Sequence, residues 1–151
     1  MNQEIKKELY HYCLQYIHLK QQTIESAQLL AKESANNDSK SSAGDKHETS
    51  RAMAQLEQEK LGIQFQELEK SKQILAKITP DIINKQIGVG ALVKTSAGNY
   101  YLSISAGKCE IKNEFYYFVS ALSPIGKALM NASSQKQFVF NNQTIEILSV
   151  T

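Results

Sequence analysis

The first half of the chain carries hydrophobic residues at helical spacing. Between residues 3 and 34 they recur alternately four and three positions apart, at Ile5, Leu9, Tyr12, Tyr16, Leu19, Thr23 and Leu30. Between residues 48 and 76 a second series recurs every seven positions, at Ala54, Leu61, Leu68 and Leu75, with Leu56, Ile63 and Phe65 beside it. A narrow apolar stripe on an otherwise polar helix is typical of two helices in contact.

The segment between these two series, "SANNDSKSSAGD", has no periodicity and is rich in residues that end helices. Two helices of similar length joined by a short polar loop pack against each other as an antiparallel hairpin. We therefore predict an antiparallel coiled-coil arm over residues 1–78, with its tip at 35–48. At ~1.5 Å per residue the first helix would run ~45 Å, which is longer than a small globular domain needs.

From residue 88 the pattern changes to short alternating runs typical of strands. Three pairs of runs are each joined by turn residues: "ALVKT" and "NYYLSIS" by "SAG", "KCEI" and "EFYYFVS" by Lys112-Asn113, and "KQFVF" and "QTIEILSV" by Asn141-Asn142. In "SPIGKALMNA", Ser123 is suited to an N-cap and Pro124 to the first position of a short helix. The predicted fold class is α + (α+β): the helical arm, a linker at 79–87, and a small antiparallel-sheet domain at 88–151.

Composition and charge narrow the class of protein. The formal charge of the 151 residues is only +2, which does not indicate an autonomous nucleic-acid binder and leaves DNA binding undecided. No apolar run approaches the ~20 residues of a membrane span, and the start of the chain lacks an apolar signal region. Cys13 and Cys109 have no partner at zinc-like spacing, so we expect two buried or half-buried thiols. A cytoplasmic protein that does not contact a membrane is the expectation.

Two acids, Asp45 and Glu48, stand three residues apart where the helical pattern restarts. One interpretation is a capping box, in which each carboxylate accepts a hydrogen bond from the backbone amide of the other residue. The other is a magnesium site, because carboxylate oxygens are ligands that Mg²⁺ prefers. Two acids cannot complete an octahedral site alone, although they could complete one that a partner supplies. The spacing alone leaves both interpretations open.

The second half of the chain is also rich in aromatic residues, which include Tyr100, Tyr101, Tyr116, Tyr117 and Phe118. Because side chains alternate along a strand, we expect alternate members to fill the core and the others to face outward. A platform on which RNA bases stack is the alternative, but basic residues do not interleave with these rings along the sequence.

The stretch "AGDKHETSRAMAQLEQ" resembles the coiled-coil tip of the Gre-type transcript cleavage and elongation factors, where a Gly-Asp-x-x-Glu string is followed by a helix. The matching residues are Gly44, Asp45, Glu48, Ala54, Glu57 and Gln58. "SPIGKALMNASSQKQFVFNNQTIEILSV" is similar to the end of that family's C-terminal domain, and "VGALVKT" to its first strand. The resemblance covers residues 41–61 and 88–150.

The resemblance implies a function and its residues. In this family the arm enters the secondary channel of bacterial RNA polymerase, and the polymerase, not the factor, cuts backtracked RNA. Asp45 and Glu48 would be the catalytic and metal-binding carboxylates, on a Mg²⁺ that is shared with the polymerase and not held tightly by the free protein. The C-terminal domain, FKBP-like in the family, would dock on the polymerase through Ser123 and Pro124. The implied protein is a monomer, is not itself an enzyme, and meets the 3′ end of nascent RNA only indirectly.

Several positions depart from the family pattern. Thr49 stands in place of an Asn, Arg51 in place of an acid and Ala52 in place of a Tyr, and Leu122 replaces a polar residue before the Ser-Pro step. These departures keep two alternatives open: a regulator that occupies the channel without stimulating cleavage, and a protein that uses its helical arm to bind some other partner. In the last case the two acids would be dispensable.

Overall fold

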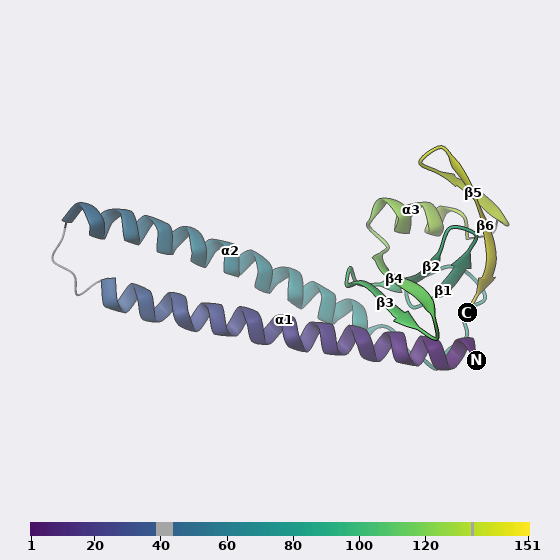
Figure 1. Ribbon diagram of the computed structural model, residues 1–151, viewed down its shortest axis with the longest axis horizontal. Coiled ribbons are helices and arrows are strands. Elements are labelled where there is room, and N and C mark those ends of the chain that lie inside the picture. The colour runs from purple at the N-terminus through teal and green to yellow at the C-terminus, as the bar shows by residue number, and fades with distance from the viewer. Residues whose placement is uncertain (39–43, 134) are drawn as a thin grey trace. The chain divides into compact units, whose positions relative to one another are not determined.

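A computed structural model describes residues 1–38, 44–133 and 135–151, and within these ranges the side chains of 35–38 and 44–47 are not described (Figure 1). Two long helices come first, followed by six strands and one short helix. The elements are α1 (Asn2–Asp38), α2 (Gly44–Ala76), β1 (Leu92–Thr95), β2 (Asn99–Ser103), β3 (Gly107–Ile111), β4 (Glu114–Ser120), α3 (Pro124–Asn131), β5 (Gln137–Phe140) and β6 (Gln143–Val150). This helix-then-sheet order confirms the predicted α+β layout.

The chain forms two compact units. One comprises Met1–Tyr16 and Gln73–Thr151, and the other comprises Ile17–Lys72. The first four turns of α1 and the end of α2 therefore belong with the sheet. The functional division into an arm, a linker and a C-terminal domain at 1–78, 79–87 and 88–151 stays a prediction.

In the helical unit, α1 and α2 run in opposite directions (Figure 1), and Ala31 of α1 and Ala54 of α2 line the same hollow. The predicted seven-residue series of α2 is confirmed at Leu61 and Leu68, which are buried. The predicted stripe of α1 is wrong beyond its first turns, because Leu19 and Leu30 are 62% and 64% exposed. The buried apolar residues of α1 are spaced mostly four apart, at Ile5, Leu9, Cys13, Ile17 and Ile24.

Both helices also extend into the segment predicted as the tip. α1 continues to Asp38 and α2 begins at Gly44, so residues 39–43 alone separate them. Once a helix has nucleated, adding a polar residue costs little, and a run of Asn and Ser does not by itself end it. The middle of the predicted tip, 39–43, lies outside the described residues.

The six strands form one sheet in the order β3-β4-β2-β1-β6-β5. The three predicted hairpins, β1-β2, β3-β4 and β5-β6, are confirmed as antiparallel pairs. The prediction of a wholly antiparallel sheet is wrong, because β2 and β4 are parallel neighbours. After β2 the chain forms β3 at the outer edge of the sheet. It then returns as β4, which lies between β3 and β2 and runs parallel to β2.

Two predicted turns set the register of their hairpins. Lys112 and Asn113 have φ values of 52° and 64°, and Asn141 and Asn142 have values of 50° and 61°. Two consecutive residues at positive φ form the turn that matches the twist of a two-residue hairpin. The predicted cap of α3 is also present, since Ser123 Oγ accepts a hydrogen bond from Gly126 N at 3.1 Å.

The two faces of the sheet are covered by different elements. On one face lie the first turns of α1, where the Tyr12 ring stacks on Phe118 with 4.6 Å between centroids and Cys13 Sγ lies 3.6 Å from Ser103 Oγ. On the other face lies α3 (Figure 1). The core on that side consists of Ile87, Ala91, Val93, Leu102, Leu129, Ala132, Phe138 and Ile145. Tyr101, Tyr116 and Phe118 are buried, which confirms that alternate aromatic residues fill the core.

The start of α1 also holds the segment between α2 and β1. The Lys6 side chain is wholly buried, and its Nζ donates hydrogen bonds to the Ile82 carbonyl at 2.6 Å and to Asn84 Oδ1 at 2.7 Å. Burial lowers the pKa of this lysine. Next to it, Lys7 forms an ion pair with Asp81 at 2.8 Å. Across the described ranges, no helix has the length and apolar character that crossing a membrane requires.

Candidate functional site

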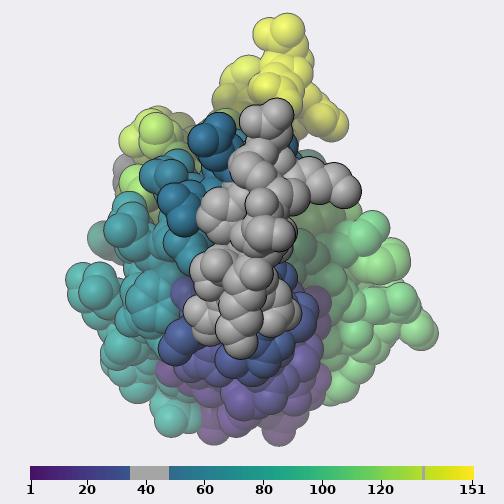
Figure 2. Space-filling view, turned by 90° about the vertical axis from the view of Figure 1, so that its left-hand side faces the viewer, coloured from purple at the N-terminus to yellow at the C-terminus, as the bar shows by residue number. Residues whose placement is uncertain are grey.

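The two acids singled out in the sequence lie in the first two turns of α2. Figure 2 looks onto the helices from the end at which α1 leads into α2. Asp45 follows the first helical residue, Gly44, and its side chain is outside the described part of the chain. Glu48 is exposed. The helix brings the backbones of these residues close together, because positions three apart are neighbours on a helix surface.

The helix boundary bears on the capping-box interpretation. In that interpretation Asp45 is the N-cap and lies outside the helix, whereas the structure places Asp45 inside α2. Carboxylates near a helix N-terminus are still favoured by the positive end of the helix dipole, by about 0.3–1 kcal/mol each. The acids therefore have a structural role available to them that does not require a ligand.

A magnesium ion would need more oxygen ligands than these two residues provide. Mg²⁺ takes about six ligands in octahedral geometry and keeps several waters. In the ranges whose side chains are described, no three His, Cys, Asp or Glu side chains come together as metal ligands would. Asp45 and Glu48 are of the right chemical type to contribute to a shell that another molecule completes.

Beside the acids, the two helices enclose an open hollow of about 570 Å³. Its walls come from both helices: Ala27, Leu30, Ala31, Ser34, Thr49, Ser50, Met53, Ala54 and Glu57. Three of these residues are alanines, whose side chains fill less of the space between the helices than leucine side chains would. The hollow is the space that they leave unfilled. Among the described side chains that line the hollow, Glu57 is the single charged one, and their exposed surface is mostly apolar.

The predicted docking residues lie at the start of α3. Ser123 Oγ accepts from Gly126 N and donates to the Ser120 carbonyl at 2.6 Å, so its hydroxyl is already engaged in capping the helix. Pro124 is the first residue of α3. Leu122, which directly precedes Ser123, is 78% exposed. A partner that docks here would therefore meet Leu122 before the Ser123 hydroxyl.

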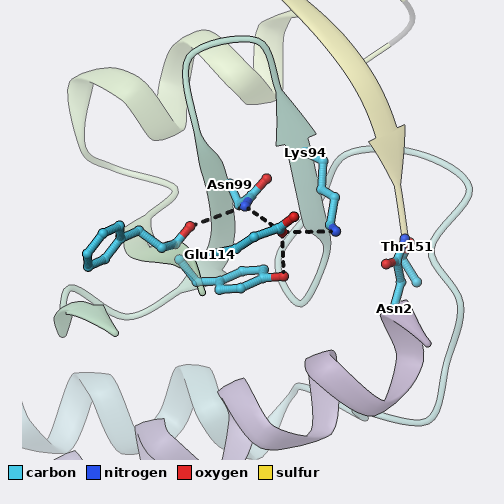
Figure 3. Close-up of polar contacts among 7 residues, drawn as sticks. Asn2, Lys94, Asn99, Glu114 and Thr151 are labelled. Atoms are coloured by element: carbon cyan, nitrogen blue, oxygen red, sulfur yellow. Dashed lines mark hydrogen bonds and ion pairs between the residues drawn. The ribbon is translucent and has the colours of Figure 1, made fainter. Parts of the chain in front are cut away.

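A polar cluster that sequence reasoning missed lies at one end of the sheet, on the face toward α1 (Figure 3). Glu114 Oε2 accepts hydrogen bonds from Tyr116 at 3.1 Å, Asn99 Nδ2 at 3.4 Å and Lys94 Nζ at 3.5 Å. The Tyr116 hydrogen bond and Lys94 lower the pKa of Glu114, while burial and Glu114 raise the pKa of Tyr116 to about 12. Nearby, Asn2 Nδ2 donates to Thr151 Oγ1 at 3.5 Å.

This cluster joins three strands and could not be recognised from spacing along the chain. Lys94 and Asn99 face each other across the β1-β2 hairpin, which the turn "SAG" does indicate. Glu114 and Tyr116 reach them only because β4 lies parallel to β2, with Asn99 opposite Tyr116. The cluster fixes the start of β4 and holds no nucleophile with an adjacent base, so we assign it a structural role.

Comparisons with known proteins find no match for this chain among protein-family models, curated proteins or solved structures.

Proposed function

We propose that this protein is a secondary-channel factor of bacterial RNA polymerase, which stimulates the cleavage of backtracked RNA and so promotes transcription elongation. In this proposal α1 and α2 form an antiparallel coiled coil, and residues 88–151 form an FKBP-like domain. The observation that carries the proposal is the position of Asp45 and Glu48 in the first two turns of α2, where one long helix gives way to the other.

The two carboxylates would act as donated ligands. In the active centre of the polymerase they would contribute oxygens to a Mg²⁺ that the polymerase also holds, and that ion would stabilise charge on the RNA phosphodiester. The free protein would not bind this ion tightly, because two carboxylates leave most of an octahedral shell to other groups. The protein would thus be an accessory factor, and the nuclease would be the polymerase.

The remaining parts would bring the acids to the polymerase. Residues 88–151 would dock on the polymerase surface around Ser123 and Pro124, where Leu122 adds an exposed apolar side chain. The protein would act in the cytoplasm as a monomer, and it would meet the 3′ end of the RNA only through the polymerase.

The test is RNA cleavage by a purified, backtracked polymerase complex in the presence of Mg²⁺. Wild-type protein should speed the release of short 3′ fragments. Asp45→Asn and Glu48→Gln keep the side-chain shape but remove the charge, and each should slow that release at least tenfold while binding to polymerase is kept. Glu59→Gln, at an exposed position farther along α2, is the matched control and should cut like wild type.

The same experiment distinguishes the other functions. If wild-type protein binds polymerase and never stimulates cleavage, it is a non-cleaving regulator of the channel, which the replacement of family residues by Thr49, Arg51 and Ala52 would explain. If it does not bind polymerase, the proposal is wrong in both forms.

A further inference from the structure

The run "EFYYFVS" of β4 presents aromatic rings on both faces of the sheet. Tyr116 and Phe118 point toward α1 and are buried, whereas Phe115 and Tyr117 lie on the opposite face and are 48% and 36% exposed. The half-buried Tyr100 of β2 is the cross-strand neighbour of Tyr117, with 5.8 Å between their ring centroids. Three rings therefore share one partly open face on neighbouring strands.

A lysine lies among these rings. Lys108 of β3 is opposite Tyr117 in the β3-β4 register, and its Nζ lies 5.0 Å from the centroid of the Phe115 ring. Along the sequence Lys108 is separated from the aromatic run by the hairpin turn, so the two come together only in the folded sheet. One basic residue on the edge strand β3 thus lies beside the aromatic rings of β4, although the two are apart along the chain.

The backbone beneath these rings is well fixed. Asn99 Nδ2 donates to the Phe115 carbonyl at 3.2 Å, and Glu114 joins the start of β4 to β1 and β2. The Tyr117 ring covers Gly98, where an added Cβ atom would lie 3.4 Å from Tyr117 Cε2. Rings held in place before binding lose less conformational freedom when a ligand stacks on them.

We propose that this face of the sheet binds single-stranded RNA, with bases stacked on Tyr117 and Phe115 and a phosphate paired with Lys108. Single-strand binders combine exposed aromatic rings with basic groups that follow the backbone. The charge of the surrounding domain suits such a ligand, since residues 88–151 contain five lysines, three glutamates, and neither Asp nor Arg. The inference does not rest on the proposed role of Asp45 and Glu48.

One acid on the same face gives the proposal a preference among bases. Glu110 is exposed and lies opposite Phe115 in the β3-β4 register. A carboxylate beside a stacked base accepts a hydrogen bond from an exocyclic amino group, as on cytosine, and repels the carbonyl oxygens of uracil. The bound strand should therefore favour cytosine over uracil.

The test uses the full chain and fluorescein-labelled 12-nucleotide RNAs, oligo(C) and oligo(U), with binding followed by fluorescence anisotropy at several salt concentrations. Oligo(C) should bind more tightly than oligo(U). It should also bind more tightly than a duplex RNA of the same length, which is the control for single-strand binding. Phe115→Leu and Tyr117→Leu keep an apolar side chain but remove the ring, and each should weaken binding by about fivefold or more. Circular dichroism and melting of each variant check that the fold is kept.

Charge variants separate this face from general electrostatic attraction. Lys108→Gln should make the plot of log affinity against log salt concentration less steep, by the amount that one phosphate contact contributes. Lys136→Gln removes a lysine beside the opposite edge strand, β5, and should leave the slope unchanged. Glu110→Gln should reduce the preference for oligo(C).

The proposal is overturned if wild-type protein binds neither RNA. A protein would then be the remaining candidate partner for this face. It is also overturned if the two leucine variants bind like wild type, or if duplex RNA binds as well as the single strands. None of these results depends on polymerase, so they are distinct from a failure of the cleavage assay.

Discussion

Gly126, in the first turn of α3, lies against the carbonyl oxygen of Ser120 so closely that a Cβ atom added to the glycine would overlap that oxygen. The contact brings the start of α3 onto the end of β4. Ser123 Oγ would also be only 2.9 Å from the added atom, so the cap of the helix occupies the remaining space. The short helix can close over the sheet core because this position has no side chain.

Replacing Gly126 by Ala should therefore destabilise the protein. The methyl group has to displace backbone, and overpacking of this kind costs about 1–3 kcal/mol or more. Gly62→Ala is the matched control, because Gly62 lies within α2 with nothing within 4 Å of an added Cβ, and there the change should stabilise the helix by about 0.5–1 kcal/mol. Urea unfolding of both variants measures the difference, and equal effects would contradict the predicted contact.

Cys13 should be unreactive in the folded protein. Burial between α1 and the sheet raises the pKa of its thiol to about 11. At pH 8 only about one thiol in a thousand would be the thiolate that reacts with a disulfide reagent. A Cys109→Ser variant isolates Cys13, which should react with such a reagent only after urea is added. Rapid labelling of the folded variant would show that α1 does not cover this thiol.

Removing the hydroxyl group should change the stability of the protein in opposite directions at two buried tyrosines, Tyr101 and Tyr116. The Tyr101 hydroxyl is buried without a hydrogen-bond partner in the described part of the chain, so Tyr101→Phe removes an unsatisfied polar group and should stabilise by about 1 kcal/mol. The Tyr116 hydroxyl donates to Glu114, so Tyr116→Phe should destabilise by about 1 kcal/mol. Thermal melting of both variants tests the pair. A loss of stability in Tyr101→Phe would mean that its hydroxyl has a partner such as a bound water.

Glu114 should make the stability fall in acid. The hydrogen bond from Tyr116, together with Lys94, holds the pKa of this carboxyl below its usual value of 4.5. The contribution of Glu114 is therefore present above pH 4.5 and is lost as the pH falls through the lowered pKa. Urea unfolding at pH 7 and pH 3 should show a smaller difference in Glu114→Gln than in wild type. Tyr116→Phe should reduce the same difference, and an unchanged difference in both variants would contradict the assignment.

Local chemistry made much of the fold predictable. The turns at Lys112-Asn113 and Asn141-Asn142 and the cap at Ser123 were predictable because each depends on the residues at that position alone. The parallel pairing of β2 with β4 was not, because it joins strands that a whole further strand separates in the chain. The α1 stripe was misassigned because Tyr12 and Cys13 each continue the series from Leu9, and only the packed sheet decides which of them is buried.

The candidate sites also differ in how much of each the sequence alone could predict. Asp45 and Glu48 could be placed at the start of a helix from sequence, because acids after a Gly and before an apolar series mark that position. Their roles depend on a partner, which a single chain does not reveal. The approach of Lys108 to Phe115 and Tyr117 depends on the register between β3 and β4, which the spacing along the chain does not give.

The turn at Lys112-Asn113 leaves this region little tolerance for length changes. Aromatic residues occupy four consecutive positions from Phe115 to Phe118, so adjacent ones face opposite sides of the sheet. A one-residue insertion or deletion that shifted the pairing would exchange the two sets and turn Phe115 and Tyr117 toward α1, at little loss of hydrophobic burial. Two competing structures of similar free energy would then be open to the chain. Natural variants of this protein should therefore vary in the identity of these two turn residues far more than in their number.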